Sequence, residues 1–191
     1  MNIREFTKKY VKDLTNLLEN IDENIVENIV QQIEQVAKNK ARFYVIGNGG
    51  SSATASHWAN DFAIGLKRRE ILTIDMVSIG DNAAVTSATA NDIGYENIFY
   101  MQLKDILKPD DVILAISCSG NSPNIVKAVE YAQEVGATVI GASGFDGGKL
   151  KELSDIKFHV NIPKGEYGLV EDVHMILDHI IYSYYIQKGN S

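Results

Sequence analysis

Residues 111–124, DVILAISCSGNSPN, join an apolar run to a loop rich in hydroxyl groups. The loop carries Ser117, Ser119 and Ser122, and the segment IVKAVEYAQEVG that follows has the pattern of a helix. Free amides and the dipole at a helix N-terminus attract an anion, and hydroxyls orient it. The loop has no lysine, which argues against a Walker-type nucleotide site. It predicts a site for the phosphate of a small molecule, although an ordinary strand, turn and helix cap would use the same residue types.

A second glycine-rich loop, GNGGSS at 47–52, also follows an apolar run. Its glycines permit positive φ angles and a close approach of backbone amides to a ligand. The spacing resembles a dinucleotide fingerprint, but Ser52 replaces the third glycine and Asp75 lies too far along the chain to hold a ribose. A dinucleotide site is therefore disfavoured.

The segment after this second loop carries His57 and Asp61, four residues apart. In a helix this spacing puts both side chains on one face, about one turn apart. Such a pair can supply two metal ligands or an acid and a base. The same spacing is also common in surface pairs that have no chemical role.

The C-terminal segment, GLVEDVHMILDHIIYSYYI, is an apolar helix pattern that contains Glu171, Asp172, His174, Asp178 and His179. Burying such groups is unfavourable unless they are paired, metal-bound or catalytic. Glu171, His174 and Asp178 form one stripe, and His179 lies about 80° round the helix from Glu171. Spacing alone leaves open which histidine faces a site, and both could be core histidines paired with carboxylates. His159, within an expected strand, is interpreted as structural.

Strands and helices alternate after the N-terminal region. Strands are expected at 43–46, 74–79, 112–116, 138–142 and 156–160, and helices at about 51–66, 83–90, 96–107, 122–135, 147–153 and 168–187. This order predicts an α/β fold with a doubly wound, mostly parallel five-stranded sheet flanked by helices. Ligands of such sheets bind beyond the carboxyl ends of the strands. The two loops should therefore lie side by side at one edge.

Residues 3–39 read as a pair of helices with a break near 20–23. We expect a single domain over 1–191, in which 1–40 is the helical pair and 41–191 the α/β core with its last helix. The apolar stripe of the pair must be covered by the domain itself or by a second chain. A homo-oligomer and a helical lid remain open at this point.

Bulk composition narrows the class of protein. The chain has 191 residues, a net charge of −7 and one cysteine, Cys118. The charge argues against nucleic-acid binding, and a single cysteine cannot form an internal disulfide. The N-terminus is too charged for a signal peptide, and no apolar run is long enough to span a membrane. These properties predict a cytoplasmic protein without a membrane or nucleic-acid partner.

The motifs together resemble the sugar isomerase (SIS) domain family, and within it the phosphoheptose isomerases. The resemblance runs over nearly the whole chain and rests on GNGGSSATASHWANDF, ANDIGYENIF, ISCSGNSPNIVKA, SGFDGG and VEDVHMILDHI. It implies an aldose–ketose isomerase that converts sedoheptulose 7-phosphate to D-glycero-D-manno-heptose 7-phosphate through an enediol. The product would feed lipopolysaccharide or capsule synthesis, and the enzyme would be a homotetramer.

The resemblance also implies roles for particular residues. Zinc would be held by His57, Asp61, Glu171 and His179, with Asp61 as base, His179 as acid and Glu171 as the alternative base. Substrate contacts would come from Asn48, Gly49, Gly50, Ser51, Ser52, Asn91, Asp92, Ser117, Ser119, Ser122 and Glu171. Asp61 and Glu171 depart from the family pattern, which has Glu and Gln there. The shorter Asp61 displaces its oxygen by roughly 1 Å, a shift that can alter a rate on the order of 100-fold.

Two other functions remain open. The chain could be a phosphosugar-binding SIS module without catalysis, either a sensor or a partner of a replication initiator. It could also isomerise another ketose phosphate. Retention of ionisable or ligating side chains at all four proposed metal positions favours an enzyme.

Overall fold

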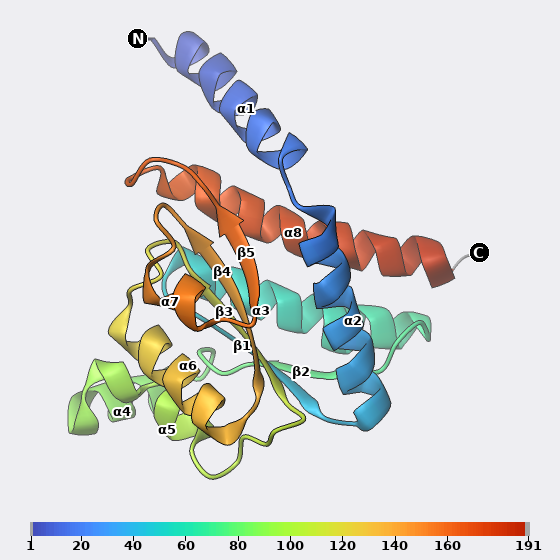
Figure 1. Ribbon diagram of the computed structural model, residues 1–191, viewed down its shortest axis with the longest axis vertical. Helices are drawn as coiled ribbons and strands as arrows, with labels where there is room; N and C mark the ends of the chain where they lie inside the picture. Colours follow the sequence, from blue (N-terminus) through green and yellow to red (C-terminus); the bar gives the residue numbers. More distant parts are fainter. Residues whose placement is uncertain (1, 190–191) are drawn as a thin grey trace.

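The computed structural model describes residues 2–189 and has a parallel five-stranded sheet at its centre (Figure 1). The strands are β1 (Arg42–Gly47), β2 (Asp75–Ser78), β3 (Val112–Ser117), β4 (Thr138–Gly144) and β5 (Ile156–Val160). Their order in the sheet is β2-β1-β3-β4-β5, and every pairing is parallel. The chain passes from β1 outward to β2, then crosses back and adds β3, β4 and β5 on the other side of β1. The predicted doubly wound fold is therefore confirmed.

Helices cover both faces of this sheet. The main helices are α1 (Ile3–Glu19), α2 (Glu23–Asn39), α3 (Gly50–Ala59), α4 (Ala83–Ile93), α5 (Tyr100–Leu103), α6 (Pro123–Val135), α7 (Gly148–Leu153) and α8 (Tyr167–Gly189). Side chains alternate along β1, so that Phe43 and Val45 pack with α2, α3 and α8, whereas Tyr44 and Ile46 pack with α5, α6 and α7. The layers therefore hold α3 and α8 together on one face.

The carboxyl ends of β1 and β3 are neighbours. Gly47 of β1 is in register with Ile116 of β3, so the two glycine- and serine-rich loops leave the sheet side by side. The side-chain amides of Asn48 and Asn124 exchange hydrogen bonds of 2.9 and 2.8 Å between these loops. The predicted adjacency of the loops is confirmed.

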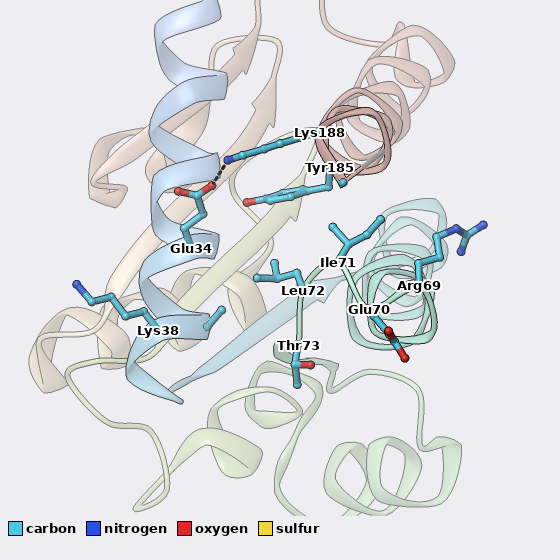
Figure 2. A pocket seen from close by; sticks show the side chains of 11 residues that line it. Glu34, Lys38, Arg69, Glu70, Ile71, Leu72, Thr73, Tyr185 and Lys188 are labelled. Atoms are coloured by element: carbon cyan, nitrogen blue, oxygen red, sulfur yellow. Dashed lines mark hydrogen bonds and ion pairs between the residues drawn. The ribbon is translucent and has the colours of Figure 1, made fainter. Parts of the chain in front are cut away.

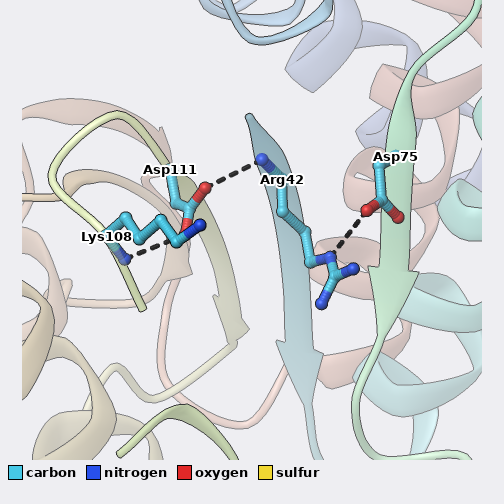
Figure 3. A network of polar contacts seen from close by, with 4 residues as sticks. All are labelled: Arg42, Asp75, Lys108 and Asp111. Carbon is cyan, nitrogen blue, oxygen red and sulfur yellow. Dashed lines mark hydrogen bonds and ion pairs between the residues drawn. The ribbon is translucent and has the colours of Figure 1, made fainter. Parts of the chain in front are cut away.

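The opposite edge of the sheet is fixed by two aspartates (Figure 3). The Asp111 carboxylate accepts the backbone N–H groups of Arg42 and Lys108 at 2.8 and 2.9 Å. The Arg42 guanidinium donates to Asp75 at 2.7 Å, so this group spans the starts of β1, β2 and β3. The network is structural, because parallel-sheet ligands bind at the other edge.

Two predicted helices differ in form from the expectation. The helix expected over 51–66 is α3 followed by a π-helix, Asn60–Leu66, and a 3-10 turn, Lys67–Arg69. The helix expected over 96–107 is a 3-10 turn at Tyr95–Asn97 and the short α5, because Asp105 has a φ of 63° that no continuing α-helix allows. π-helical segments widen a helix and often occur at functional sites.

The two N-terminal helices behave differently. Helix α2 buries Ile29, Ile33 and Val36 against the sheet of its own chain. Helix α1 projects from the body and buries none of its residues fully (Figure 1). Its Tyr10 hydroxyl donates to Asp172 of α8 at 2.7 Å. The self-packed alternative thus holds for α2, while α1 leaves an apolar surface exposed.

Candidate active site

A pocket of about 240 Å³ lies at the carboxyl ends of β1 and β3. Its wall contains six residues that the sequence predicted for substrate binding, namely Asn48, Ser51, Ser117, Ser119, Ser122 and Glu171. Ser117 and Ser122 have their Oγ atoms 3.4 Å apart, and Ser122 is the N-cap of α6. Hydroxyl groups and the start of α6 therefore meet in one small space, which suits an anionic group.

Three further lining residues, Ile116, Cys118 and Tyr167, were not predicted to contact substrate. Burial, together with the charge of Glu171, raises the pKa of the Cys118 thiol to about 11, which leaves it protonated and unreactive at neutral pH. Tyr167 opens α8 and stacks edge-on against Phe145 at 5.0 Å between ring centroids. An aromatic residue ahead of the last helix was the only sequence signal for this contact.

Glu171 lies against the first turn of α3. A Cβ atom added to Gly50 would lie 2.5 Å from both Glu171 carboxylate oxygens, so only glycine leaves this acid room. The positive end of the α3 dipole favours a carboxylate there. Glu171 is thus part of the wall of the pocket of about 240 Å³ at the ends of β1 and β3, which we call the serine pocket.

Other predicted substrate contacts do not line this pocket. Gly49, Gly50 and Ser52 belong to the GNGGSS segment that follows β1 but are not among the lining residues. Asn91 and Asp92 are exposed near the end of α4 and bond to each other at 2.8 Å. The segment after α4 still contacts the pocket, because the Tyr95 hydroxyl donates a hydrogen bond of 2.9 Å to Oδ1 of the lining residue Asn48.

Farther along α8, and where α3 continues into the π-helix Asn60–Leu66, four side chains converge on one point. The Nε2 atom of His57 lies 3.1 Å from His179 Nε2, 3.4 Å from Asp61 Oδ2 and 3.7 Å from Asp178 Oδ2. One ligand atom from each of these four residues lies within 4.8 Å of every other. This set, which we call the His–Asp cluster, contains three of the four predicted metal ligands. Glu171 is not part of it, and Asp178 supplies the fourth side chain.

Asp178 is the buried member of the His–Asp cluster. Its side chain has no exposed surface, and neither carboxylate oxygen has a hydrogen-bond partner among the described residues. Burial, reinforced by the nearby Asp61 carboxylate, raises the pKa of Asp178 to about 8. A buried acid with no donor is unfavourable unless something else compensates it.

The structure separates the two histidines of α8. His174 is buried in the core, where its Nε2 lies 3.3 Å from the Ser143 carbonyl oxygen, and burial lowers its pKa to about 4. His179 instead faces His57 at the surface of the helix pair. His159 also stays apart from the site, with its Nδ1 atom 3.1 Å from Ser143 Oγ. His179 is therefore the histidine of α8 that faces the site.

A larger pocket, of about 650 Å³, lies elsewhere (Figure 2). It is bordered by the ends of α2 and α8 and the segment before β2, and an ion pair of 3.0 Å joins Glu34 to Lys188 within it. The end of α2 and residues 69–73 lead into the starts of β1 and β2, and the end of α8 lies beside them. The pocket is thus at the edge where a doubly wound sheet does not bind its ligand.

Comparison with known proteins places the chain in a family. A family model described as the SIS domain matches residues 9–144. The chain belongs to the SIS domain family. The phosphoheptose isomerase of Fusobacterium nucleatum subsp. nucleatum is 38% identical over 155 residues, covering 78% of each chain. That of Helicobacter pylori (strain P12) is 33% identical over 147 residues, which cover 77% of this chain and 75% of the relative.

The fold agrees with that assignment. A solved structure of the phosphoheptose isomerase of Neisseria gonorrhoeae superposes with a TM-score of 0.86 at 24% identity, covering 97% of this chain and 100% of that one. Among the described residues, no helix is long and apolar enough to cross a membrane. The two features of this structure that a function must explain are the serine pocket and the His–Asp cluster.

Proposed function

We propose that the chain is an aldose–ketose isomerase that converts sedoheptulose 7-phosphate to D-glycero-D-manno-heptose 7-phosphate. The observation that carries this proposal is that the His–Asp cluster lies farther along the helical segments that begin at the serine pocket, α8 and α3 with the π-helix that follows it. The relatives named phosphoheptose isomerase support the substrate. Such a product would serve as a precursor for the heptose of lipopolysaccharide or capsule.

Helices α3 and α8 give the site two ends. Ser51 and Glu171 lie in the pocket near the starts of these helices, and His57 and His179 follow six and eight residues later. At about 1.5 Å per residue, the two ends are roughly 9 to 12 Å apart along the helices. An extended sugar phosphate can place its phosphate at the serines and its carbonyl end toward the histidines. Binding of the phosphate then orients the reacting carbons.

The reaction moves one proton between adjacent carbons. A base removes a proton from C1 while an acid protonates the C2 carbonyl oxygen, which gives a cis-enediol. Loss of the O1 proton and protonation of C2 then form the aldehyde at C1. We assign the base to Asp61, with Glu171 as the alternative because it lines the pocket, and the acid to His179.

The donor set of the cluster fits a divalent metal ion, and we propose zinc. Imidazole nitrogen and carboxylate oxygen are ligands that zinc takes in catalytic sites, and the orphaned Asp178 oxygens point to an absent positive charge. His57, Asp61 and His179 would hold the ion. When bound, the ion would polarise the substrate carbonyl and stabilise charge on its oxygen.

We also propose that the protein works as a homotetramer in the cytoplasm. Helix α1 exposes Ile3, Phe6 and Val11, a surface that a second copy could cover. The single buried Cys118 is typical of a protein from a reducing compartment. Chromatography with light scattering at several protein concentrations would test the tetramer.

A phosphosugar sensor is the competing function. It would need the serine pocket but not the His–Asp cluster, which is the observation that favours the enzyme. An isomerase for another ketose phosphate would use the same site.

Proton NMR of the zinc-loaded protein with sedoheptulose 7-phosphate in D₂O tests the proposal. The expected result is an aldoheptose 7-phosphate with deuterium at C2. Binding of the ketose without product or exchange would overturn the isomerase. In the same assay, Asp61→Asn is expected to lose most activity; if only Glu171→Gln is inactive, the base is Glu171.

A further inference from the structure

Asp178 occupies a position that its surroundings do not explain. It lies on α8 between Leu177 and His179, its side chain is fully buried, and neither oxygen accepts a hydrogen bond from any described residue. Two ionisable groups face it, the Asp61 carboxyl and the His57 imidazole, and the His57 Nε2 lies 3.7 Å from Asp178 Oδ2, beyond hydrogen-bond distance. Without a cation the arrangement is destabilising.

The distances from His57 to the other members of the cluster are close to those between ligand atoms around a bound ion, and every pair of ligand atoms lies within 4.8 Å. A tetrahedral ion with ligand bonds of 2.0–2.2 Å has ligand atoms about 3.3–3.6 Å apart. The separations from His57 Nε2 to the other three ligand atoms are 3.1, 3.4 and 3.7 Å. The two imidazole rings meet nearly edge to face at 76°, so their Nε2 atoms approach the same point.

Glu171 is held elsewhere. It lies eight residues before His179, a rise of about 12 Å along α8. Its carboxylate lies against Gly50 in the wall of the serine pocket. It is therefore available to the sugar rather than to the cluster.

We propose that Asp178, and not Glu171, completes the divalent metal site with His57, Asp61 and His179. The inference deepens the proposed function, because it names the ligand set of that same site and leaves Glu171 to contact the sugar. The positive charge of the ion compensates both buried carboxylate oxygens of Asp178. The burial of an otherwise unpaired acid is then accounted for.

Metal binding in the absence of substrate tests this ligand set. Zinc affinity is measured by competition with a chromophoric chelator for the wild type, Asp178→Asn and Glu171→Gln. Loss of a direct ligand is expected to weaken binding by at least about 100-fold, beyond the 10- to 100-fold typical for an outer partner of a ligand. Asp178→Asn should show this loss and Glu171→Gln should not. Equal affinity of Asp178→Asn and the wild type, or a loss in Glu171→Gln alone, would overturn the inference.

Two further readouts separate ligation from folding. The visible absorption of the cobalt(II)-loaded protein is expected to change in Asp178→Asn and to stay as in the wild type in Glu171→Gln. The metal-free Asp178→Leu protein should melt at or above the wild-type temperature, since a buried carboxyl group without a hydrogen-bond partner is replaced by an apolar side chain. Leu leaves no buried polar group, so it replaces Asn should the amide prevent folding. A cobalt spectrum that is unchanged from the wild type in both Asp178→Asn and Asp178→Leu would contradict the inference.

These measurements are independent of turnover. A wild type that binds zinc through Asp178 but does not isomerise the ketose would overturn the proposed function alone. If the wild type is an active isomerase but Asp178→Asn binds zinc with the same affinity as the wild type, the ligand set alone is overturned.

Discussion

His57 and His179 lie 122 residues apart in the sequence, yet their Nε2 atoms are 3.1 Å apart. The contact brings α3 and α8 together at the point where Asp61 and Asp178 also converge. Only one of the two facing nitrogens can carry the proton of a hydrogen bond between them, so the other is unprotonated and accepts that bond through its lone pair. That is the arrangement a metal ligand or an acid–base group requires.

Replacing His179 by alanine is expected to reduce turnover by at least about 100-fold, because the proposed acid and one proposed metal ligand are lost. His179 is exposed, so the melting temperature of the metal-free protein should change little. His159→Ala is the matched control, since His159 lies on β5 and contacts Ser143. Steady-state rates and thermal melts check both; an active His179→Ala would remove His179 from the mechanism.

Ser119→Glu should weaken binding of sedoheptulose 7-phosphate by at least about 10-fold, because a carboxylate in the serine pocket repels the phosphate. Thr73→Glu, an exposed change just before β2 at the other edge of the sheet, adds the same charge as a control. Calorimetric titration gives both affinities. Equal weakening by the two variants would mean that net charge, not the serine pocket, controls binding.

Gly50→Ala is expected to displace Glu171, whose carboxylate oxygens lie 2.5 Å from the new Cβ. Because Glu171 is a flexible side chain, the fold should survive while turnover falls by about 10-fold or more. In a Glu171→Gln background the same change should have a much smaller effect if both act through this carboxylate. Additive losses in this double-mutant cycle would show that Gly50 acts in some other way.

Relative to a His174→Met variant, the metal-free protein should lose stability as the pH drops from about 6.5 toward 4, whereas Asp178, whose folded pKa is raised to about 8, contributes the opposite slope in both proteins. Burial holds the folded pKa of His174 at about 4, below the ordinary 6.5, so the unfolded chain binds the extra proton in this window. The slope is at most about 1.4 kcal/mol per pH unit from this group. Urea unfolding at several pH values checks it, and His174→Met should lose this contribution. An unchanged slope in that variant would show that His174 is not the group responsible.

Local sequence patterns determined much of this protein. Alternating apolar strands and helices indicate the doubly wound sheet, because each element must bury one face. The predicted serines of the 117–122 loop line one pocket, since the carboxyl ends of adjacent parallel strands meet at one edge. The i,i+4 spacing of His57 and Asp61 likewise placed both on one face of a helix.

Tertiary structure alone decided how α8 faces its neighbours. Glu171, His174, Asp178 and His179 lie on one half of the helix, so spacing could not assign them to core, pocket or cluster. The packing of α8 on α3 and the sheet buries His174, turns Glu171 toward Gly50 and brings Asp178 and His179 to His57. A helix repeats its directions every 3.6 residues, but what it meets in each direction is fixed only by contacts between distant parts of the chain.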